Sequence, residues 1–562
     1  MRVKHIMIFI ISIFGAFVSL NANSNAYTCP IKEPITVKKN DIEYNNKPFV
    51  DAGRNVFLGG EIKSWSNADE VTSPIVDEAT GKRTIIGSIP RMTSKEAYEA
   101  VEYAEKAWNG GQGEWPQMTT QQRIDTLERI VIGLKEKRDE IIKTLMWEIC
   151  KSSSDAASEF DRTMKFIEST IAAFKKIDSD NMSVWSVVSG VYAKIRRAAI
   201  GIMLCIGPYN YPFNETYATL IPALLMGNVA IMKLPAVGGL SHMLTIETYA
   251  KELPKGVLQF ISGSGRETIP PVMRTGKIDV LAFIGGSVTA DNIIKEHPHP
   301  HRLRLFLQLE GKNLGIVTPS ADLNIATEQI VVGSTSFNGQ RCTAIKLVMV
   351  HRSIANNFAT ELAEKISSLP TGLPWETGVK ITPLPEPRKP AYLESLIQDA
   401  VKHGAEVINA HMGGGEIQGA LMKPAVVYPV TKSMRLWHEE QFGPVIPIAI
   451  YDTEEDIREY IRIMPYGQQA AIFANDASDV SPFVDMLGNV VGRINLNTQC
   501  GRSPDSLPFS GRRSSAVGTM SVTETLKAFS VETLVASKEK KENLQILQEV
   551  EQKSNFLQAL RE

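Results

Sequence analysis

The stretch FNGQRCTA, residues 337–344, contains the side chain best suited to nucleophilic chemistry, the thiol of Cys342. Its neighbours are polar and include Arg341, a cation that favours the reactive thiolate form of cysteine. Cys150 and Cys205 lie in apolar runs, as buried core cysteines do. Cys342 is therefore the candidate nucleophile, although its residue type alone is equally compatible with a place in the core.

A second stretch, LFLQLEGKN at residues 305–313, bears on which group could activate water beside such a cysteine. If Cys342 forms an acyl intermediate, a base must take a proton from the water that releases the acyl group. The stretch offers an amide at Gln308, 34 residues before Cys342, and a carboxylate at Glu310. A neutral amide orients water but cannot take its proton. Glu310 points to the same face as Gln308 if the segment is extended.

Short apolar runs that alternate with helical patterns are the elements that must position these residues. Buried strands alternating with helices predict a parallel, doubly wound sheet, which binds nucleotides at the carboxyl ends of its strands. A second α/β block begins after Gly311. The strand-like runs of the first block are 200–207, 229–235, 257–263 and 279–286, and the helical stretches between them include 214–227 and 240–253.

The composition excludes several classes of function. The 562 residues are 43% hydrophobic and 22% charged, with a net charge of −2. We therefore expect neither nucleic-acid binding nor attachment of the mature chain to a membrane. The five cysteines are widely scattered and match neither a disulfide framework nor a zinc spacing, so no metal site is expected.

The N-terminus has the layout of a targeting signal. Basic residues, an apolar run from Ile6 to Leu20 and a small residue at Ala26 predict a secretory signal peptide over 1–26. A membrane anchor is the alternative, but the apolar run is short for one. Segment 27–55 is rich in Lys and Asn, which predicts a disordered leader or a transit segment that directs the protein onward to a plastid-like organelle.

Several motifs occur in a fixed order around GQRC, and on them the chain resembles the aldehyde dehydrogenase superfamily. The resemblance runs from Val56 to Ser537. Several motifs in register make it far more specific than a single glycine-rich loop. The motifs are GPYNYPFN (207–214), IMKLP (231–235), EEQFGPV (439–445) and LPFSGRRSSAVG (507–518).

The resemblance implies an α/β fold of three parts, followed by a charged helical tail over 538–562. The small β bridging element would pair with other subunits, because an exposed ribbon needs a partner edge, so a dimer or tetramer is expected. The implied parts are a doubly wound dinucleotide-binding domain (56–184 and 198–309), an α/β catalytic domain (310–505) and the bridging element (185–197 and 506–537).

The resemblance also implies the chemistry. Cys342 would add to an aldehyde, and the side-chain amide of Asn210 and the backbone N–H of Cys342 would form the oxyanion hole. Collapse of the adduct would pass hydride to a nicotinamide cofactor and leave a thioester. The residues implied to hold the cofactor are Gly207, Lys233, Ala236, Gly265, Gly285, Gly286, Glu440 and Phe442.

Within the superfamily, the chain resembles the non-phosphorylating glyceraldehyde-3-phosphate dehydrogenases, which oxidise their substrate to 3-phosphoglycerate with NADP. Guanidinium groups and a phenol are what a phosphorylated aldehyde requires. Ala236 stands where this branch has a Thr that helps hold the 2′-phosphate of NADP, so NAD is also compatible. The residues implied to bind substrate are Arg162, Tyr211, Arg341, Thr343 and Arg502.

The family pattern Glu-Leu-Gly-Gly-Lys, when laid on QLEGK, places Gln308 at the general base and Glu310 at the first Gly. Three hypotheses follow. Glu310 replaces the base, or the enzyme acts on another anionic aldehyde or transfers the acyl group to coenzyme A, or the protein binds nucleotide with little turnover. Loss of a general base costs on the order of 10² to 10⁴ in rate.

Overall fold

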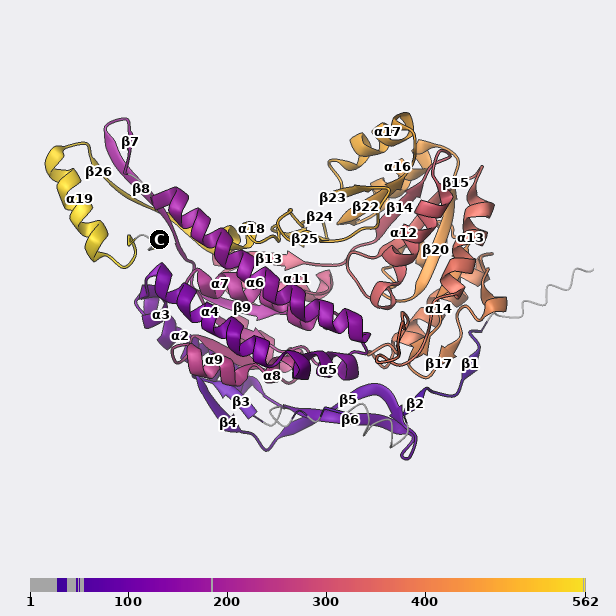
Figure 1. Cartoon of the computed structure of the whole chain (residues 1–562), viewed down its shortest axis with the longest axis horizontal. Coiled ribbons are helices and arrows are strands. Elements are labelled where there is room, and N and C mark those ends of the chain that lie inside the picture. The colour runs from indigo at the N-terminus through magenta and orange to yellow at the C-terminus, as the bar shows by residue number, and fades with distance from the viewer. Residues whose placement is uncertain are drawn as a thin grey trace, which may run out of the picture.

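The computed structural model describes residues 28–37, 47–48, 50, 55–182, 185–558 and 560. The predicted signal peptide over 1–26 lies outside these residues. The described chain forms two lobes, each built on an open sheet packed against helices, with a narrow ribbon projecting from one lobe (Figure 1). Within the described residues, no helix is both long enough and apolar enough to cross a bilayer.

The first lobe is built on an eight-stranded sheet with the order β25-β13-β12-β9-β10-β11-β3-β4. Strands β9 to β13 run parallel, and β9 and β10 are buried along their whole length, because helices shield both faces. The chain builds outward from β9 in one direction and then from β12 in the other, so the order reverses between β9 and β12. The strands are β3 (Asn55–Leu58), β4 (Glu61–Ser64), β9 (Ile202–Ile206), β10 (Val229–Lys233), β11 (Leu258–Ile261), β12 (Val280–Ile284), β13 (Arg304–Gln308) and β25 (Ala516–Val517).

Helices of the first lobe pack on this sheet and on one another. The long helix α6 packs against α7, and Glu159 of α6 links the two helices. Glu159 forms a fully buried ion pair with Lys151, which precedes α6. It also accepts the backbone N–H groups of Phe213 and Asn214 at the start of α7. The helices are α2 (Ser94–Trp108), α3 (Glu114–Gln117), α4 (Thr120–Glu136), α5 (Arg138–Glu148), α6 (Ser153–Met182), α7 (Pro212–Leu225), α8 (Leu240–Met243), α9 (Ile246–Glu252), α10 (Gly265–Arg274) and α11 (Ser287–Lys295).

The second lobe is built on a seven-stranded sheet with the order β16-β19-β20-β15-β14-β22-β23, parallel except for β16. This confirms the predicted doubly wound α/β architecture with a second α/β domain. The strands are β14 (Asn313–Val317), β15 (Ile345–His351), β16 (Glu406–Val407), β19 (Ala425–Tyr428), β20 (Val445–Tyr451), β22 (Gln469–Phe473) and β23 (Arg493–Leu496). The helices are α12 (Leu323–Thr335), α13 (Ala355–Ser367), α14 (Lys389–Lys402), α15 (Arg435–His438), α16 (Glu454–Ile463) and α17 (Ala477–Leu487).

The projecting ribbon is a three-stranded antiparallel sheet of β26 (Ser530–Lys538), β8 (Val191–Ala199) and β7 (Ser186–Val188). Its boundaries differ from those predicted, because residues 506–529 do not join it. Instead, β25 extends the first sheet beside β13, and β24 (Arg512–Arg513) pairs with β21 (Tyr466–Gly467) of the second lobe, before α18 (Glu524–Ala528). These segments therefore connect the two lobes.

The C-terminal tail folds back on the ribbon as α19 (Lys541–Lys553), as Figure 1 shows at its left edge. Leu547 and Leu557 pack with Trp185 in a small buried cluster. Glu551 accepts the indole N–H of Trp185 at 3.0 Å and pairs with the ammonium of Lys194 at 2.8 Å. The tail is thus a largely exposed helix that packs on the ribbon through Leu547 and Glu551.

Replacing Glu551 by Ala should loosen this tail. Hydrogen bonds to charged groups contribute about 1.5–3 kcal/mol each, and the variant loses both contacts of one carboxylate. We expect a lower melting temperature and faster hydrogen exchange over 541–553. Glu549→Ala on the same helix is the control, because Glu549 is 71% exposed and its loss should cost less than about 0.5 kcal/mol. Equal exchange in the two variants would contradict this role of Glu551.

Segment 27–55 is not disordered over all of its length. Strand β1 (Ile31–Lys32) pairs with β17 (Ile417–Gln418), which pairs with β18 (Leu421–Met422), and β2 (Thr36–Val37) pairs with β5 (Ala68–Asp77) of the hairpin formed with β6 (Lys82–Pro90). Val37 and Val50 are buried. The prediction of a disordered leader is wrong for these residues, because apolar side chains spaced along a polar segment anchor it.

Candidate active site

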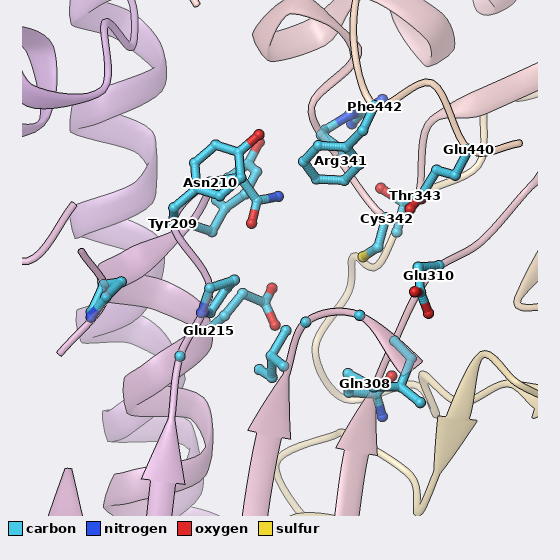
Figure 2. A pocket seen from close by; sticks show the side chains of 18 of the residues that line it. Tyr209, Asn210, Glu215, Gln308, Glu310, Arg341, Cys342, Thr343, Glu440 and Phe442 are labelled. Carbon is cyan, nitrogen blue, oxygen red and sulfur yellow. The ribbon is translucent and has the colours of Figure 1, made fainter. Parts of the chain in front are cut away.

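A cavity of about 1030 Å³ lies between the lobes, at the carboxyl ends of β9 and β12 where the strand order reverses. Ligands of open α/β sheets bind at such a point. Figure 2 shows that side chains from both lobes point into it. The predicted site residues that line it are Arg162, Gly207, Asn210, Tyr211, Ala236, Gly285, Gly286, Gln308, Glu310, Arg341, Cys342, Thr343, Glu440, Phe442 and Arg502. Lys233 and Gly265 are not among the described residues that line it.

Cys342 stands on a tightly wound loop between α12 and β15. The turn before it, at Phe337, Asn338 and Gly339, has positive φ angles of 47°, 57° and 70°. A Cβ at Gly339 would lie 2.6 Å from the carbonyl oxygen of Ser334, so only glycine fits. Asn338 holds the turn through two hydrogen bonds to the backbone of Thr382, at 3.0 and 2.9 Å. The loop therefore presents the thiol from a rigid support.

The surroundings of Cys342 raise the pKa of its thiol, which favours the neutral form. Burial raises its pKa first, and the carboxylate of Glu215 raises it further, whereas the Lys346 ammonium and a hydrogen bond with Gln468 lower it. Arg341 instead donates Nη2 to the carbonyl oxygens of Val332 and Gly333, at 3.3 and 3.1 Å. The expected lowering of the thiol pKa by Arg341 is therefore wrong, and attack requires a group that accepts the thiol proton.

Asn210 faces Cys342 from the loop that precedes α7. Its side-chain amide donates to the carbonyl oxygen of Gln340 at 2.7 Å, which fixes the amide beside the nucleophile loop. Tyr209 donates its hydroxyl to Gln340 Oε1 at 3.1 Å and contacts the ring of Phe442. An amide nitrogen carries two hydrogens, so Asn210 keeps one donor for an oxyanion.

Gln308 ends β13 in the floor of the cavity. The residue is only 2% exposed, and neither its amide nitrogen nor its amide oxygen has a hydrogen-bond partner within the described residues. Leaving such a group unpaired costs free energy, so buried amides are usually satisfied. Gln308 is therefore poised for a water or a substrate atom, but it cannot act as a base.

Glu310 does not share the environment of Gln308. Both of its carboxylate oxygens accept the backbone N–H of Ser287, each at 2.8 Å, and one also accepts the Ser287 hydroxyl at 3.2 Å. Ser287 is the first residue of α11, so the carboxylate sits on a helix N-terminus, where negative charge is favoured. In this arrangement Glu310 is bound to the helix rather than free to activate water.

The same helix N-terminus is where a dinucleotide phosphate fits. Gly285 and Gly286 precede it at the end of β12 and line the cavity, and a Cβ on Gly286 would lie 3.1 Å from Glu310 Oε1. A backbone with no side chain before a helix N-terminus is a common phosphate cradle. The residues present therefore fit the cofactor implied by the fold, and the Glu310 carboxylate lies on the helix N-terminus that would hold its phosphate.

Glu310→Gln should therefore bind NADP more tightly. Binding of the phosphate requires the Glu310 carboxylate to give up charge-assisted hydrogen bonds of about 1.5–3 kcal/mol, which weakens NADP binding. An amide forms weaker hydrogen bonds with Ser287 and therefore opposes phosphate binding less. We expect the Kd to fall about 10- to 100-fold. Calorimetric titration with NADP measures this without turnover, and Glu386→Gln, another acid of the cavity wall, is the control. An unchanged Kd in Glu310→Gln would show that the carboxylate and the phosphate do not compete.

Two predicted cofactor residues have partners inside the protein. Glu440 pairs with the buried Lys346 at 2.6 Å and accepts the Gly311 N–H at 3.2 Å. Lys233, at the end of β10, donates to the carbonyl oxygen of Leu234 at 2.7 Å, and burial lowers its pKa to about 8. Gly265 begins α10 after β11. Lys233 thus ends β10 and Gly265 follows β11 at the same edge of the sheet, but neither is among the described residues that line the cavity.

Two of the three predicted substrate arginines, Arg162 and Arg502, are held by acids. Arg162 makes two hydrogen bonds to Asp505, at 3.0 and 2.6 Å. Arg502 pairs with the same carboxylate at 3.2 Å and with Glu215 at 2.5 Å. Arg502 Nη2 and Arg341 Nε are buried without a partner in the described chain. Donors of two guanidinium groups in this wall therefore await an acceptor.

Sequence reasoning missed several cavity residues, of which Glu215 matters most. It follows Asn210 by five residues, in the first turn of α7. A carboxylate so close to the oxyanion residue could have been noticed in the sequence. The motif GPYNYPFN ends at Asn214, however, and so leaves out Glu215 by one position. Tyr211, predicted to bind substrate, lines the cavity, with the Lys151 ammonium 3.3 Å from its ring centre.

Comparisons with known proteins agree with this geometry. The aldehyde dehydrogenase family model matches residues 65–535. The NADP-dependent glyceraldehyde-3-phosphate dehydrogenase of Streptococcus equinus is 31% identical over 481 residues, which cover 84% of this chain and 96% of that protein. The enzyme of that name from Arabidopsis thaliana is 27% identical over 476 residues, covering 84% and 92%.

A solved structure shows the same fold. The crystal structure of NADP-dependent glyceraldehyde-3-phosphate dehydrogenase from Bacillus halodurans complexed with NADP has a TM-score of 0.78 and 30% identity, and the alignment covers 87% of this chain and all of that chain. The shared fold and the length of the family match leave one conclusion. This chain belongs to the aldehyde dehydrogenase family.

Proposed function

We propose that this protein oxidises glyceraldehyde 3-phosphate to 3-phosphoglycerate, with NADP as hydride acceptor and NAD as an alternative. The observation that carries the proposal is the pair of unpartnered guanidinium donors, on Arg341 and Arg502, in the wall of the cavity that holds Cys342. A buried donor without a partner costs free energy that a phosphate oxygen removes. The names of the relatives above support the same substrate.

The chain's own groups account for the acyl chemistry. The Cys342 thiol loses its proton to water in the cavity as sulfur bonds to the aldehyde carbon, and the Asn210 amide donates to the oxygen that becomes negative. The bound cofactor supplies the acceptor for the hydride that this carbon loses as the thioester forms. Water then releases the acid and restores the cysteine.

Formation of NADPH by the purified protein tests the proposal. We expect turnover with glyceraldehyde 3-phosphate and NADP, and a lower kcat/KM for glyceraldehyde, which lacks the phosphate that the arginines bind. Product that forms only when coenzyme A is added would instead identify an acyl-transferring enzyme. Cofactor binding without NADPH, even in the first turnover, would identify a nucleotide-binding protein and contradict the proposal.

We also propose that the protein forms a dimer or tetramer through its ribbon. One face of β8 and β26 carries exposed apolar side chains, Val191, Ile195 and Leu534, at 37%, 45% and 58% exposure. Isolated ribbons of this kind gain stability when a second copy covers them. Light scattering should give a mass above that of one chain, and Ile195→Lys should lower it; a monomeric parent protein would refute the proposal.

A further inference from the structure

Glu215 is an acid of the cavity that the mechanism above does not use. Its carboxylate points into the cavity from α7, on the opposite side from the sulfur of Cys342 (Figure 2). One oxygen, Oε1, accepts Arg502 Nη1 at 2.5 Å. The hydrogen bonds of the described residues leave the other oxygen, Oε2, without a donor. Glu215 therefore has one oxygen committed to an arginine and one available to the cavity.

The other candidates for a base are less suitable. Gln308 is neutral, and Glu310 is bound through both carboxylate oxygens to Ser287. Glu440 is ion-paired with Lys346. After burial, the charge of Glu215 has the largest effect on the Cys342 thiol and raises its pKa, ahead of the charge of Glu440. Glu215 is thus the cavity acid that combines the strongest electrostatic coupling to the reacting sulfur with an oxygen that has no donor among the described residues.

We propose that Glu215 is the general base for hydrolysis of the thioester on Cys342. It would replace the family's Glu, at whose position this chain has Gln308. This inference rests on the proposed function, because the thioester must form first. Glu215 Oε2 takes a proton from water as the water oxygen bonds to the thioester carbonyl carbon. The carbon–sulfur bond then breaks and its electron pair stays on sulfur. The acid product loses its proton to solvent, and Glu215 returns its proton to Cys342.

The pairing with Arg502 links this base to the charge of the substrate. While Arg502 holds Oε1, the carboxylate is drawn toward the guanidinium. A phosphate that accepts from the unpartnered Nη2 of Arg502 shares the charge of the guanidinium, which weakens its hold on Glu215 through Nη1 and favours movement of Glu215 into the cavity. Hydrolysis should therefore be fastest for thioesters that carry a negatively charged group, which is the substrate class proposed above.

Rapid mixing with glyceraldehyde 3-phosphate and NADP, followed by acid quench, tests the inference through two signals. The first is the NADPH burst, and the second is the acyl group on Cys342, measured by mass spectrometry of the intact protein. In Glu215→Gln we expect the burst to remain and the thioester to accumulate, with hydrolysis slowed about 10²- to 10⁴-fold. Gln keeps a hydrogen-bond acceptor for Arg502, so the change removes mainly the base.

Two further variants separate a base from a structural partner of Arg502. Asp505→Asn is the matched control, because Asp505 is the other carboxylate on this guanidinium; its thioester should not accumulate. Adding Gln308→Glu to Glu215→Gln should restore hydrolysis at least about tenfold, since it returns a carboxylate to the position of the family base. That rescue also shows that the single variant is folded.

Hydrolysis at the parent rate in Glu215→Gln, or accumulation in Glu310→Gln instead, would overturn the inference. A comparison that needs no variant gives a second test: the thioester formed from glyceraldehyde should hydrolyse about tenfold more slowly than the phosphorylated one, and equal rates would also overturn it. Different results would refute the proposed function and the role of Glu215. Absence of any NADPH formation by the parent protein refutes the proposed function, whereas NADPH formation with normal hydrolysis in Glu215→Gln refutes only the role of Glu215.

Discussion

Cys342→Ala should reduce NADPH formation by on the order of 10⁴ or more, because no other group can form the covalent intermediate. Among the free cysteines of the described chain, Cys342 is the one that is not fully buried, and it alone lines the cavity. NADP affinity should not change, since the substitution leaves Gly285, Gly286 and Ser287 in place. The measurement is initial NADPH formation, paired with a calorimetric titration of NADP.

Cys29→Ala is the control for loss of a thiol. Cys29 is buried beside β1, away from the cavity, so this variant should retain the parent rate and lose only about 1 kcal/mol of stability. Substantial NADPH formation by Cys342→Ala would mean that oxidation proceeds without the covalent intermediate. The proposed mechanism would then be wrong, whatever the substrate.

Asn210→Ala should slow formation of the thioester about 10²- to 10³-fold, the usual cost of removing one oxyanion donor. The amide is fixed by its 2.7 Å hydrogen bond to Gln340, so the donor is oriented before the substrate arrives. The loss should appear in the NADPH burst rather than in KM, because the charge on oxygen develops only in the transition state.

Stopped-flow measurement of the burst separates the two steps. Tyr209→Phe is a suitable companion variant. It removes the hydrogen bond from the Tyr209 hydroxyl to Gln340 and should slow the burst less than Asn210→Ala does. If Asn210→Ala raised KM and left the burst rate intact, Asn210 would bind ground-state substrate and would not be an oxyanion donor.

Much of the fold could be predicted from the sequence, because the buried parallel strands consist of continuous runs of apolar residues. Strands β9, β10, β11 and β12 fall within the predicted runs, and their order places Gly207 and Gly285 at one edge. The pairing of β1 and β2 was not predictable, because two-residue strands carry no periodic pattern and depend on distant partners. The split of residues 506–529 between lobes has the same cause.

The candidate site was predictable where a motif fixes a backbone position and less so where charges choose partners. Asn210 and Cys342 line one cavity because their loops are set by local geometry. The partners of Glu310, Arg162 and Arg502 depend on which opposite charges or helix ends lie nearby in space. Spacing placed Glu310 on the face of Gln308, whereas three hydrogen bonds hold it on Ser287.

The central claim is that glyceraldehyde 3-phosphate is oxidised while bound to Cys342. The most direct measurement is quenched-flow mass spectrometry of the peptide that contains Cys342, taken during the first turnover with NADP. We predict a 3-phosphoglyceryl group on Cys342 that rises with NADPH in equal amount and then disappears as 3-phosphoglycerate forms. NADPH that appears without this group, or with an acyl group on another cysteine, would contradict the account.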